Sequence, residues 1–364
     1  MLSTQLTIKL TFIPTQDCRR LLFDVPPAYA ELLSLISKRF GLDETSIDIT
    51  YIDSDNDYVR VACEEDLRAA ISFAEEVGKP PVLKLLLNGK PKSDRIPQKI
   101  SSDVTPDDLR RNVSQRYAEL ATAKPKSCGC KAKKYAMSLG YTSEDLEEEI
   151  TPVGALSCGN PVGIADLKAG ESVMDLGCGT GFDCRLAAKR VGPSGKVVGV
   201  DMTKEMLDKA AELTKPDKYP QVSYHLSTIE DVGSIEEYAG QFDAVLSNCV
   251  FNLSPEKQKV LNGVFTVLKP GGRLIFSDPV ALRPIPSSVK SDMASYTQCM
   301  ANASSVDSLS QMLSAAGFDR VSVEVKDDST SYIRRWTPNS QWEGGLTPST
   351  YIATATVWAY KPSL

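Results

Sequence analysis

Cysteine is the residue type in this sequence best suited to unusual chemistry. The 364 residues include nine cysteines and a single histidine, His225. Residues 1–12 alternate polar and apolar side chains and do not resemble a secretory signal, so the cysteines are expected to be reduced thiols. Metal, metalloid or redox chemistry of sulfur is therefore favoured, and catalysis by histidine is nearly excluded. We interpret His225, which lies in a predicted strand, as structural.

A glycine-rich loop is the second chemical feature. A predicted strand ends in Gly177, Gly179 and Gly181, and the following predicted strand ends in Asp201. Glycine permits a sharp turn and a close approach of the backbone to a ligand. The carboxylate of Asp201 can accept hydrogen bonds from ribose hydroxyls. The loop alone could be an ordinary tight turn, but together with Asp201 it predicts a nucleotide site.

Cys249 is expected on the same edge as this loop. It follows the predicted strand 242–247, and the carboxyl ends of the strands in an open parallel sheet border the ligand crevice. The other candidate cysteines lie in separate segments: Cys128, Cys130, Cys158 and Cys299. Their spacing does not match a structural zinc site. Thiolates from separate segments can converge on one soft centre, and the alternative is a set of independent core cysteines.

The elements that must position these residues form an alternating pattern from Glu171 onward. Short apolar strands alternate with helical stretches, which predicts a parallel, doubly wound sheet. The predicted strands are 172–176, 196–200, 222–226, 242–247 and 273–277. One helix is expected to begin at Pro255 and Glu256 and to end at the Lys-Pro-Gly-Gly segment 269–272.

A separate unit is predicted for residues 1–88. Alternating strands and two amphipathic helices, 29–40 and 64–77, follow the order ββαββαβ, which suits a small sheet packed on helices. Residues 89–105 are rich in Lys, Pro, Ser and Asp and are expected to be a linker. The second domain is then 106–364 and opens with a helix that has Thr105 as its N-cap and Pro106 at its first position.

Charge and hydropathy limit the partners that we expect. The net charge of −6 argues against a nucleic-acid partner, and no apolar run approaches the length of a membrane helix. We therefore expect a cytoplasmic protein that acts on a small molecule, with no membrane partner.

The glycine loop resembles that of class I S-adenosylmethionine-dependent methyltransferases, which have a Rossmann-like doubly wound sheet. The resemblance implies that the three glycines border the amino-acid part of the cofactor, that Asp175 lies near its amino group and that Asp201 binds the ribose. It also implies an adenine site beside Ile229 and Glu230. The cofactor-binding set that it implies is Asp175, Gly177, Gly179, Gly181, Asp201, Met202, Ile229, Glu230 and Asn248.

Four motifs narrow the resemblance to the arsenite methyltransferases. They are Ser-Cys-Gly-Asn-Pro at 157–161, DLGCGTGFDC at 175–184, Val-Asp-Met-Thr at 200–203 and Ser-Asn-Cys-Val-Phe-Asn-Leu-Ser at 247–254, and the tail 336–362 is also similar. The resemblance implies that Cys158 and Cys249 bind trivalent arsenic and relay thiol–disulfide exchange. Cys299 matches a further arsenic ligand, and Cys128 or Cys130 matches a redox partner.

The implied reaction is transfer of the methyl group of S-adenosylmethionine to thiol-bound arsenite, as in arsenic detoxification. Methylation oxidises the arsenic formally, so a cysteine pair must supply electrons, and an external thiol reductant of the glutathione or thioredoxin type must restore it. Two alternatives remain. The enzyme could methylate an organic acceptor with purely structural cysteines, or the chain could be an inactive scaffold that works through its N-terminal module.

The N-terminal module resembles the Phox-and-Bem-type interaction domain, a ubiquitin-like β-grasp fold. The acidic segment 53–57 matches that family's acidic signature, and Lys9, Arg19 and Arg20 match its basic surface. The resemblance implies head-to-tail self-association or binding to a similar domain. A calcium loop is rejected because Tyr58 occupies the position that requires glycine, and a merely solvated acidic turn is the alternative.

The remaining cysteines are expected to have no chemical role. We interpret Cys18 and Cys63 as buried fillers of the first domain and Cys178 and Cys184 as packing residues around the glycine loop.

Overall fold

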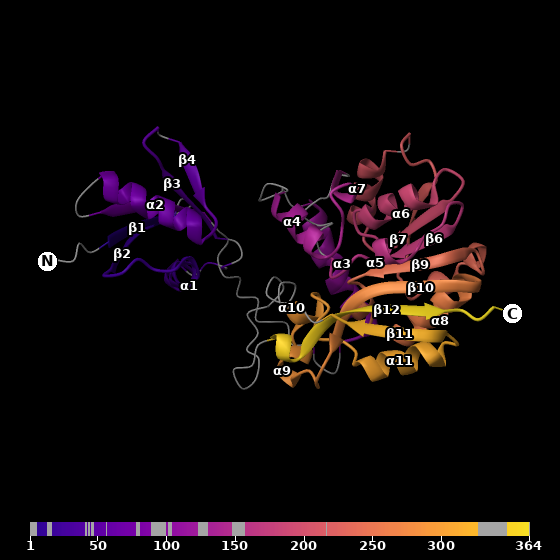
Figure 1. The fold of residues 1–364 in the computed structure, drawn as a ribbon. Coiled ribbons are helices and arrows are strands. Elements are labelled where there is room, and N and C mark those ends of the chain that lie inside the picture. Colours follow the sequence, from indigo (N-terminus) through magenta and orange to yellow (C-terminus); the bar gives the residue numbers. More distant parts are fainter. Residues whose placement is uncertain are drawn as a thin grey trace. The chain divides into compact units, whose positions relative to one another are not determined.

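The computed structural model describes residues 6–12, 17–40, 42, 44, 47–55, 57–77, 81–88, 100, 104–122, 130–147, 157–215, 217–326 and 348–363. The chain divides into two compact units, Met1–Ile96 and Pro97–Leu364. Both appear in Figure 1, the first in indigo and violet and the second from magenta to yellow. Most of the expected linker lies outside the described residues.

The first unit is a five-stranded sheet with two helices, in the predicted order ββαββαβ. The strands run β2-β1-β5-β3-β4 across the sheet, with β1 and β5 parallel and the other pairs antiparallel. The elements are β1 (Leu6–Phe12), β2 (Asp17–Phe23), α1 (Tyr29–Phe40), β3 (Asp48–Ile52), β4 (Tyr58–Val61), α2 (Glu64–Val77) and β5 (Val82–Asn88).

Strand alternation determines which side chains fill the core of this unit. Leu6, Ile8 and Leu10 of β1 are buried, so the residues between them face outward. Cys18 lies directly opposite Thr11 on the outward face and is exposed. The expectation that Cys18 is a buried filler is therefore wrong, and Cys63 is only partly buried because it lies just before the first turn of α2.

The same alternation divides the predicted basic surface. Lys9 is directly opposite Arg20 on β2 and Lys84 on β5, so these three form an outward basic row. Arg19 is instead opposite buried Leu10, on the other face of the sheet, with its guanidinium carbon 4.8 Å from the ring centre of Phe40. Arg19 is therefore separated from the basic row.

The acidic segment 53–57 connects β3 to β4, at the opposite edge of the sheet from β2. The Asp53 carboxylate accepts hydrogen bonds from the backbone N–H groups of Asp55 and Asp57, both at 3.0 Å. Asp53 therefore orders the turn, while the side chains of Asp55 and Asp57 are exposed.

The second unit is built on a seven-stranded sheet with the order β11-β12-β10-β9-β6-β7-β8. Strands β10, β9, β6, β7 and β8 are parallel, and β12 is antiparallel to both β10 and β11. The strands are β6 (Ser172–Leu176), β7 (Lys196–Asp201), β8 (Val222–Leu226), β9 (Phe242–Asn248), β10 (Leu268–Ala281), β11 (Asp319–Val325) and β12 (Ile352–Tyr360).

Helices cover both faces of this sheet. Buried side chains of α8 and α11 pack on one face, and those of α4, α5, α6 and α7 pack on the other. The prediction of a doubly wound sheet is therefore confirmed. The α-helices are α3 (Pro106–Thr122), α4 (Cys130–Ser138), α5 (Pro161–Ile164), α6 (Phe182–Val191), α7 (Lys204–Thr214), α8 (Lys257–Val267), α9 (Ser287–Lys290), α10 (Met293–Tyr296) and α11 (Val306–Ala315). In the described part of the chain, no helix is long and apolar enough to cross a membrane.

Strands β7 and β9 each end one residue later than expected, and two other boundaries differ for identifiable reasons. Strand β10 is much longer than 273–277 because β12 pairs with it from Arg273 to Ala281, beyond the end of β9. Helix α8 begins at Lys257, two residues later than expected, because Glu256 is its N-cap. The predicted N-cap of α3 is confirmed: Thr105 Oγ1 accepts a hydrogen bond from the backbone N–H of Asp108 at 3.2 Å.

Candidate active site

A cavity of about 110 Å³ lies at the carboxyl ends of β6, β7 and β9. This is the edge at which the sequence placed the nucleotide site and Cys249. Eight of the nine expected cofactor residues line the cavity, together with Cys249: Asp175, Gly177, Gly179, Asp201, Met202, Ile229, Glu230 and Asn248. Gly181, Cys158 and Cys299 do not line it.

The glycine loop needs glycine for two physical reasons. Gly177, Gly179 and Gly181 have φ angles of 67°, 52° and 72°, in the left-handed region that other residues rarely adopt. A Cβ atom on Gly177 would lie 2.4 Å from Val250 Cγ1, and one on Gly181 would lie 2.2 Å from the Tyr224 hydroxyl. Gly179 faces open space within 4 Å, so its backbone is the part of the loop that a ligand can approach.

Asp201 holds this loop against the end of β7. Its Oδ2 accepts a hydrogen bond from Gly179 N at 3.0 Å, and its Oδ1 accepts one from Thr203 N at 2.8 Å. Burial raises the pKa of the Asp201 carboxyl, and these backbone donors oppose the shift. Each carboxylate oxygen can accept a further hydrogen bond, which leaves acceptors for a ligand hydroxyl.

Two more carboxylates lie under the loop. Asp175 is buried and accepts a hydrogen bond from the Cys184 thiol at 3.2 Å. Asp183 accepts hydrogen bonds from the Tyr141 hydroxyl at 2.7 Å and from Asn248 Nδ2 at 3.0 Å. Burial raises the pKa of the Asp175 carboxyl well above its usual range, and the charge of Asp183 adds to the shift. A bound cation would relieve this repulsion.

The charges around the cavity favour a cationic ligand. Its lining contains four carboxylates, those of Asp175, Asp183, Asp201 and Glu230, and one guanidinium, that of Arg110. A sulfonium and an ammonium group in one small molecule would suit such a lining. The open approach at the glycine loop and the buried acceptors therefore fit S-adenosylmethionine.

Three cysteines converge directly beside the cavity. The Cys158 thiol donates to Ser277 O at 3.1 Å, and the Cys299 thiol donates to Cys249 O at 3.0 Å. The side chains of all three cysteines belong to one buried packing group. All three are at most 6% exposed, and of the three only Cys249 lines the cavity. We call Cys158, Cys249 and Cys299 the thiol cluster.

The environment of Cys158 and Cys299 favours the protonated form of both thiols. Burial raises the pKa of Cys158 and Cys299 well above the usual range, and the neighbouring Cys249 side chain raises both further. Among the described residues, no group of three His, Cys, Asp or Glu side chains is already arranged to hold a metal ion. The Cys158 and Cys299 thiols donate to backbone carbonyls, so both must turn before the three sulfurs can share one atom.

The backbone conformation of two cysteines and the side-chain amide of Asn248 hold the thiol cluster beside the glycine loop. Cys249 and Cys299 have φ angles of 61° and 63°, a strained conformation that is often found at functional sites. Asn248 Oδ1 accepts a hydrogen bond from Cys158 N at 3.2 Å, and its Nδ2 donates to Asp183. Asn248 therefore connects the Cys158 segment to the helix that follows the glycine loop.

The structure describes the other candidate residues, which are the remaining cysteines of the second unit and His225, to different extents. Cys128 lies outside the described residues, and Cys130 is the first residue of α4, with its side chain outside the description. Helix α4 packs beside the thiol cluster, because the Tyr135 hydroxyl donates to Ser157 O at 2.8 Å. Cys178 and Cys184 are buried. His225 is partly buried in β8, with Nδ1 3.2 Å from the Tyr238 hydroxyl.

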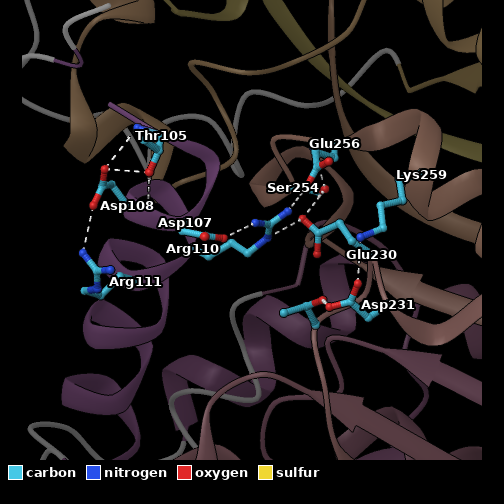
Figure 2. Close-up of polar contacts among 11 residues, drawn as sticks. Thr105, Asp107, Asp108, Arg110, Arg111, Glu230, Asp231, Ser254, Glu256 and Lys259 are labelled. Carbon is cyan, nitrogen blue, oxygen red and sulfur yellow. Dashed lines mark hydrogen bonds and ion pairs between the residues drawn. The ribbon is translucent and has the colours of Figure 1, made fainter. Parts of the chain in front are cut away.

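The sequence analysis did not find the residues that α3 contributes. Arg110, Val113 and Tyr117 line the cavity, although their spacing of three and four residues on a predicted helix was visible in the sequence. Figure 2 shows Arg110 extended toward Glu230 and Glu256. One oxygen of Glu230, an expected adenine neighbour, is therefore already hydrogen bonded to the protein.

Comparisons with known proteins agree with both units. Residues 167–317 match the family model of a methyltransferase domain, and residues 5–90 match that of the PB1 domain. The chain is 39% identical over 278 residues to an arsenite methyltransferase of Halobacterium salinarum, a match that covers 72% of this chain and 69% of the relative.

Other similar proteins are also named as arsenic methyltransferases. An arsenite methyltransferase of Aquipseudomonas alcaligenes is 44% identical over 38% of this chain and 41% of its own length. The corresponding Homo sapiens protein is 34% identical over 57% of this chain and 55% of its own length. A solved structure of an arsenic(III) S-adenosylmethionine methyltransferase from Chlamydomonas reinhardtii aligns with a TM-score of 0.47 and 28% identity, over 66% of this chain and 75% of that one.

Proposed function

Because the chain belongs to the arsenite methyltransferase family, we propose that it methylates trivalent arsenic held by the thiol cluster, with S-adenosylmethionine as the methyl donor. The observation that carries this proposal is the convergence of Cys158, Cys249 and Cys299 beside an acidic, glycine-bordered cavity. The cofactor supplies an electrophilic methyl group when it is bound. The glycine loop and Asp201 are suited to hold its amino-acid and ribose parts, with Asp175 near its ammonium group.

Arsenite capture fits protonated thiols. Arsenite in neutral water carries three hydroxyl groups, and each thiol that binds arsenic releases one proton to a departing hydroxide. Three arsenic–sulfur bonds and three water molecules result, so no separate base is needed. Trivalent arsenic is soft and prefers sulfur ligands. The raised pKa values of Cys158 and Cys299 therefore do not prevent binding.

Positioning is then the main contribution of the protein to methyl transfer. The arsenic lone pair attacks the methyl carbon, a carbon–arsenic bond forms, and the carbon–sulfur bond of the donor breaks with its electrons going to that sulfur. Cys249 lines the cavity, so arsenic bound there would face the methyl group. Holding the two reactants in line accounts for a large part of the acceleration in such displacements.

The electrons that return the methylated arsenic to the trivalent state come from the sulfur ligands. Methylation leaves the arsenic formally pentavalent and positively charged. Two of its sulfur ligands can depart as a disulfide, which returns two electrons to arsenic, while a hydroxide from water takes a vacated position and the proton of that water is released. We propose Cys128 or Cys130 as the partner in the subsequent thiol–disulfide exchange. An external thiol reductant, of the glutathione or thioredoxin type, then restores the thiols. This requirement supports a reducing compartment such as the cytoplasm.

The direct test is incubation of the full chain with arsenite, S-adenosylmethionine and a thiol reductant, followed by arsenic speciation. We expect methylated arsenic, with one molecule of S-adenosylhomocysteine formed for each methyl group transferred. If the cofactor binds but no methylated arsenic forms, the enzyme acts on an organic acceptor instead. Absence of cofactor binding would leave the scaffold alternative.

We also propose that the N-terminal unit associates head to tail with a second copy or a similar domain. The basic row consists of Arg20 on β2, Lys9 on β1 and Lys84 on β5. The acidic turn 53–57 lies between β3 and β4, toward the other edge of the sheet. Complementary surfaces at opposite edges allow a heterologous contact that can propagate into chains. Ion pairs at such an exposed contact weaken as salt rises.

Sedimentation of the full chain tests this contact. We expect oligomers at low salt and monomers at 1 M salt, where the screening length is only about 3 Å. Lys9→Ala and the double change Asp55→Ala with Asp57→Ala should each prevent self-association, whereas a mixture of the two variants should form a dimer. Glu75→Ala, on the exposed side of α2, is the charge control and should behave as the wild type. A monomer at every salt concentration, with no partner domain bound, would contradict the proposal.

A further inference from the structure

Helix α3 lies over the cofactor cavity, although it precedes the segment that matches the methyltransferase domain. Arg110, Val113 and Tyr117 of α3 all line the cavity. Their spacing of three and four residues places them on one face of the helix. The first half of this face is polar and the second half is apolar, so the helix is held in place by two different kinds of contact.

The polar contact is a fork of ion pairs made by Arg110. Its Nε donates to Glu230 Oε1 at 3.2 Å, one terminal nitrogen donates to Asp107 Oδ1 at 2.7 Å, and the other donates to Glu256. The Ser254 hydroxyl donates to the same Glu230 oxygen at 2.6 Å. Figure 2 shows the guanidinium lying between α3 and the two glutamates. We call the contacts of Arg110 with Glu230 and Glu256 the latch.

The latch joins segments that are far apart in the sequence. Glu230 follows β8, and Glu256 is the N-cap of α8. The side chains of Arg110 and Glu230 are only 16% and 3% exposed, so solvent screens their interaction weakly. The charge of Glu230 raises the pKa of Arg110, in opposition to the effect of burial. Loss of the guanidinium would leave a buried carboxylate without its cation.

The apolar contact covers the thiol cluster. Val113 belongs to the same buried group of side chains as Cys158, Cys249 and Cys299, and Tyr117 packs against that group. The α3 helix therefore borders both the place where the cofactor would bind and the place where arsenic would bind. Its removal would open both to water.

We propose that α3 is a lid over the methyl-transfer site and that Arg110 is the positioning residue that holds the lid closed over bound S-adenosylmethionine. This inference rests on the proposed cofactor site but does not depend on arsenite. The latch acts from outside the reacting atoms, because the guanidinium binds carboxylates of the protein. Its role is to keep the apolar face of α3 against the cavity.

The neighbouring residue offers a matched control. Arg111 is also an arginine on α3, but its side chain is 74% exposed and pairs with Asp108 on the same helix. Figure 2 shows it directed away from Glu230. Removing Arg111 therefore removes a positive charge from α3 without touching the latch.

The experiment measures cofactor binding and helix protection in the full chain. Affinity for S-adenosylhomocysteine is measured by calorimetry, and hydrogen–deuterium exchange of residues 106–122 is followed with and without this ligand. For Arg110→Ala we expect a dissociation constant about tenfold higher and loss of the ligand-dependent protection of α3. Arg110→Lys should recover part of the affinity, because lysine supplies the charge but not the fork. Arg111→Ala should remain within about twofold of the wild type.

A second variant covers the case in which Arg110→Ala does not fold. Glu256→Gln weakens the latch at its partly exposed end and should raise the dissociation constant about threefold, with faster exchange in α3. The lid proposal would be overturned if Arg110→Ala bound S-adenosylhomocysteine and protected α3 from exchange as the wild type does. It would also be overturned if Arg111→Ala had an effect as large as that of Arg110→Ala. If the wild-type chain itself bound no ligand, the proposed cofactor site would fail instead, so the two failures are distinguishable.

Discussion

The Cys249→Ser variant is expected to lose at least about a thousandfold in arsenite methylation while its affinity for S-adenosylmethionine stays close to that of the wild type. Cys249 is the member of the thiol cluster that lines the cavity, and it packs in one buried group with Cys158 and Cys299. A serine hydroxyl is a hard ligand and does not replace sulfur on arsenic. The variant would hold arsenic by two sulfurs at most and away from the methyl group.

The readout is methylated arsenic per enzyme, measured together with calorimetric titration of the cofactor. Cys158→Ser should show the same pattern. Cys18→Ser and Cys63→Ser, in the N-terminal unit, are the controls and should keep full activity. Full turnover by Cys249→Ser would exclude the three-thiolate mechanism. Loss of multiple turnover in Cys130→Ser but not in Cys128→Ser would identify the redox partner.

The Asp201→Ala variant is expected to bind S-adenosylmethionine about a hundredfold more weakly. The Asp201 carboxylate accepts hydrogen bonds from the backbone N–H groups of Gly179 and Thr203. Alanine would leave both donors without this partner and would release the glycine loop from the end of β7. Each unpaired donor costs about 1–3 kcal/mol in a buried site, and the lost contacts to ribose hydroxyls add to this. A factor of one hundred corresponds to about 2.7 kcal/mol.

Calorimetric titration tests this result, with Asp208→Ala as the control. Asp208 is an exposed acid on α7 that pairs with Lys204, so it shares the change of charge without touching the loop. Asp201→Asn keeps an amide oxygen as one acceptor and should show an intermediate affinity. Wild-type affinity in Asp201→Ala would show that this carboxylate neither orders the loop nor binds the cofactor.

Local patterns in the sequence were sufficient for most elements. Short strand-like runs between helical stretches predicted β6 and β8 at their observed bounds, although β6 is buried and β8, at the edge of the sheet, is only partly buried. Thr105 and Pro106 located the start of α3 because capping involves only neighbouring backbone groups. Elements shaped by distant partners were less predictable. Pairing with β12, which is far along the chain, extends β10 beyond the expected range.

Which face a side chain occupies was predicted less well. Arg19 and Arg20 are adjacent in the sequence and both basic, yet only Arg20 shares the outward face with Lys9. Cys18 was expected to be buried and is exposed for the same reason. In a strand the direction of every side chain depends on its register with the neighbouring strand, and a shift of one residue reverses it.

The sequence by itself determined the chemistry that this protein can carry: the glycine loop with Asp201, and cysteines in separate segments with almost no histidine. Only the tertiary structure decided which of these side chains meet. Cys158 and Cys249 come together because the end of β9 lies beside Ser277 of β10, whose carbonyl oxygen accepts hydrogen bonds from Cys158 Sγ and Cys249 N. Cys299 joins them because its thiol donates to Cys249 O. Arg110 reaches Glu230, 120 residues away, because α3 folds over the same edge of the sheet. Such contacts depend on how elements pack, and spacing along the chain does not encode them directly.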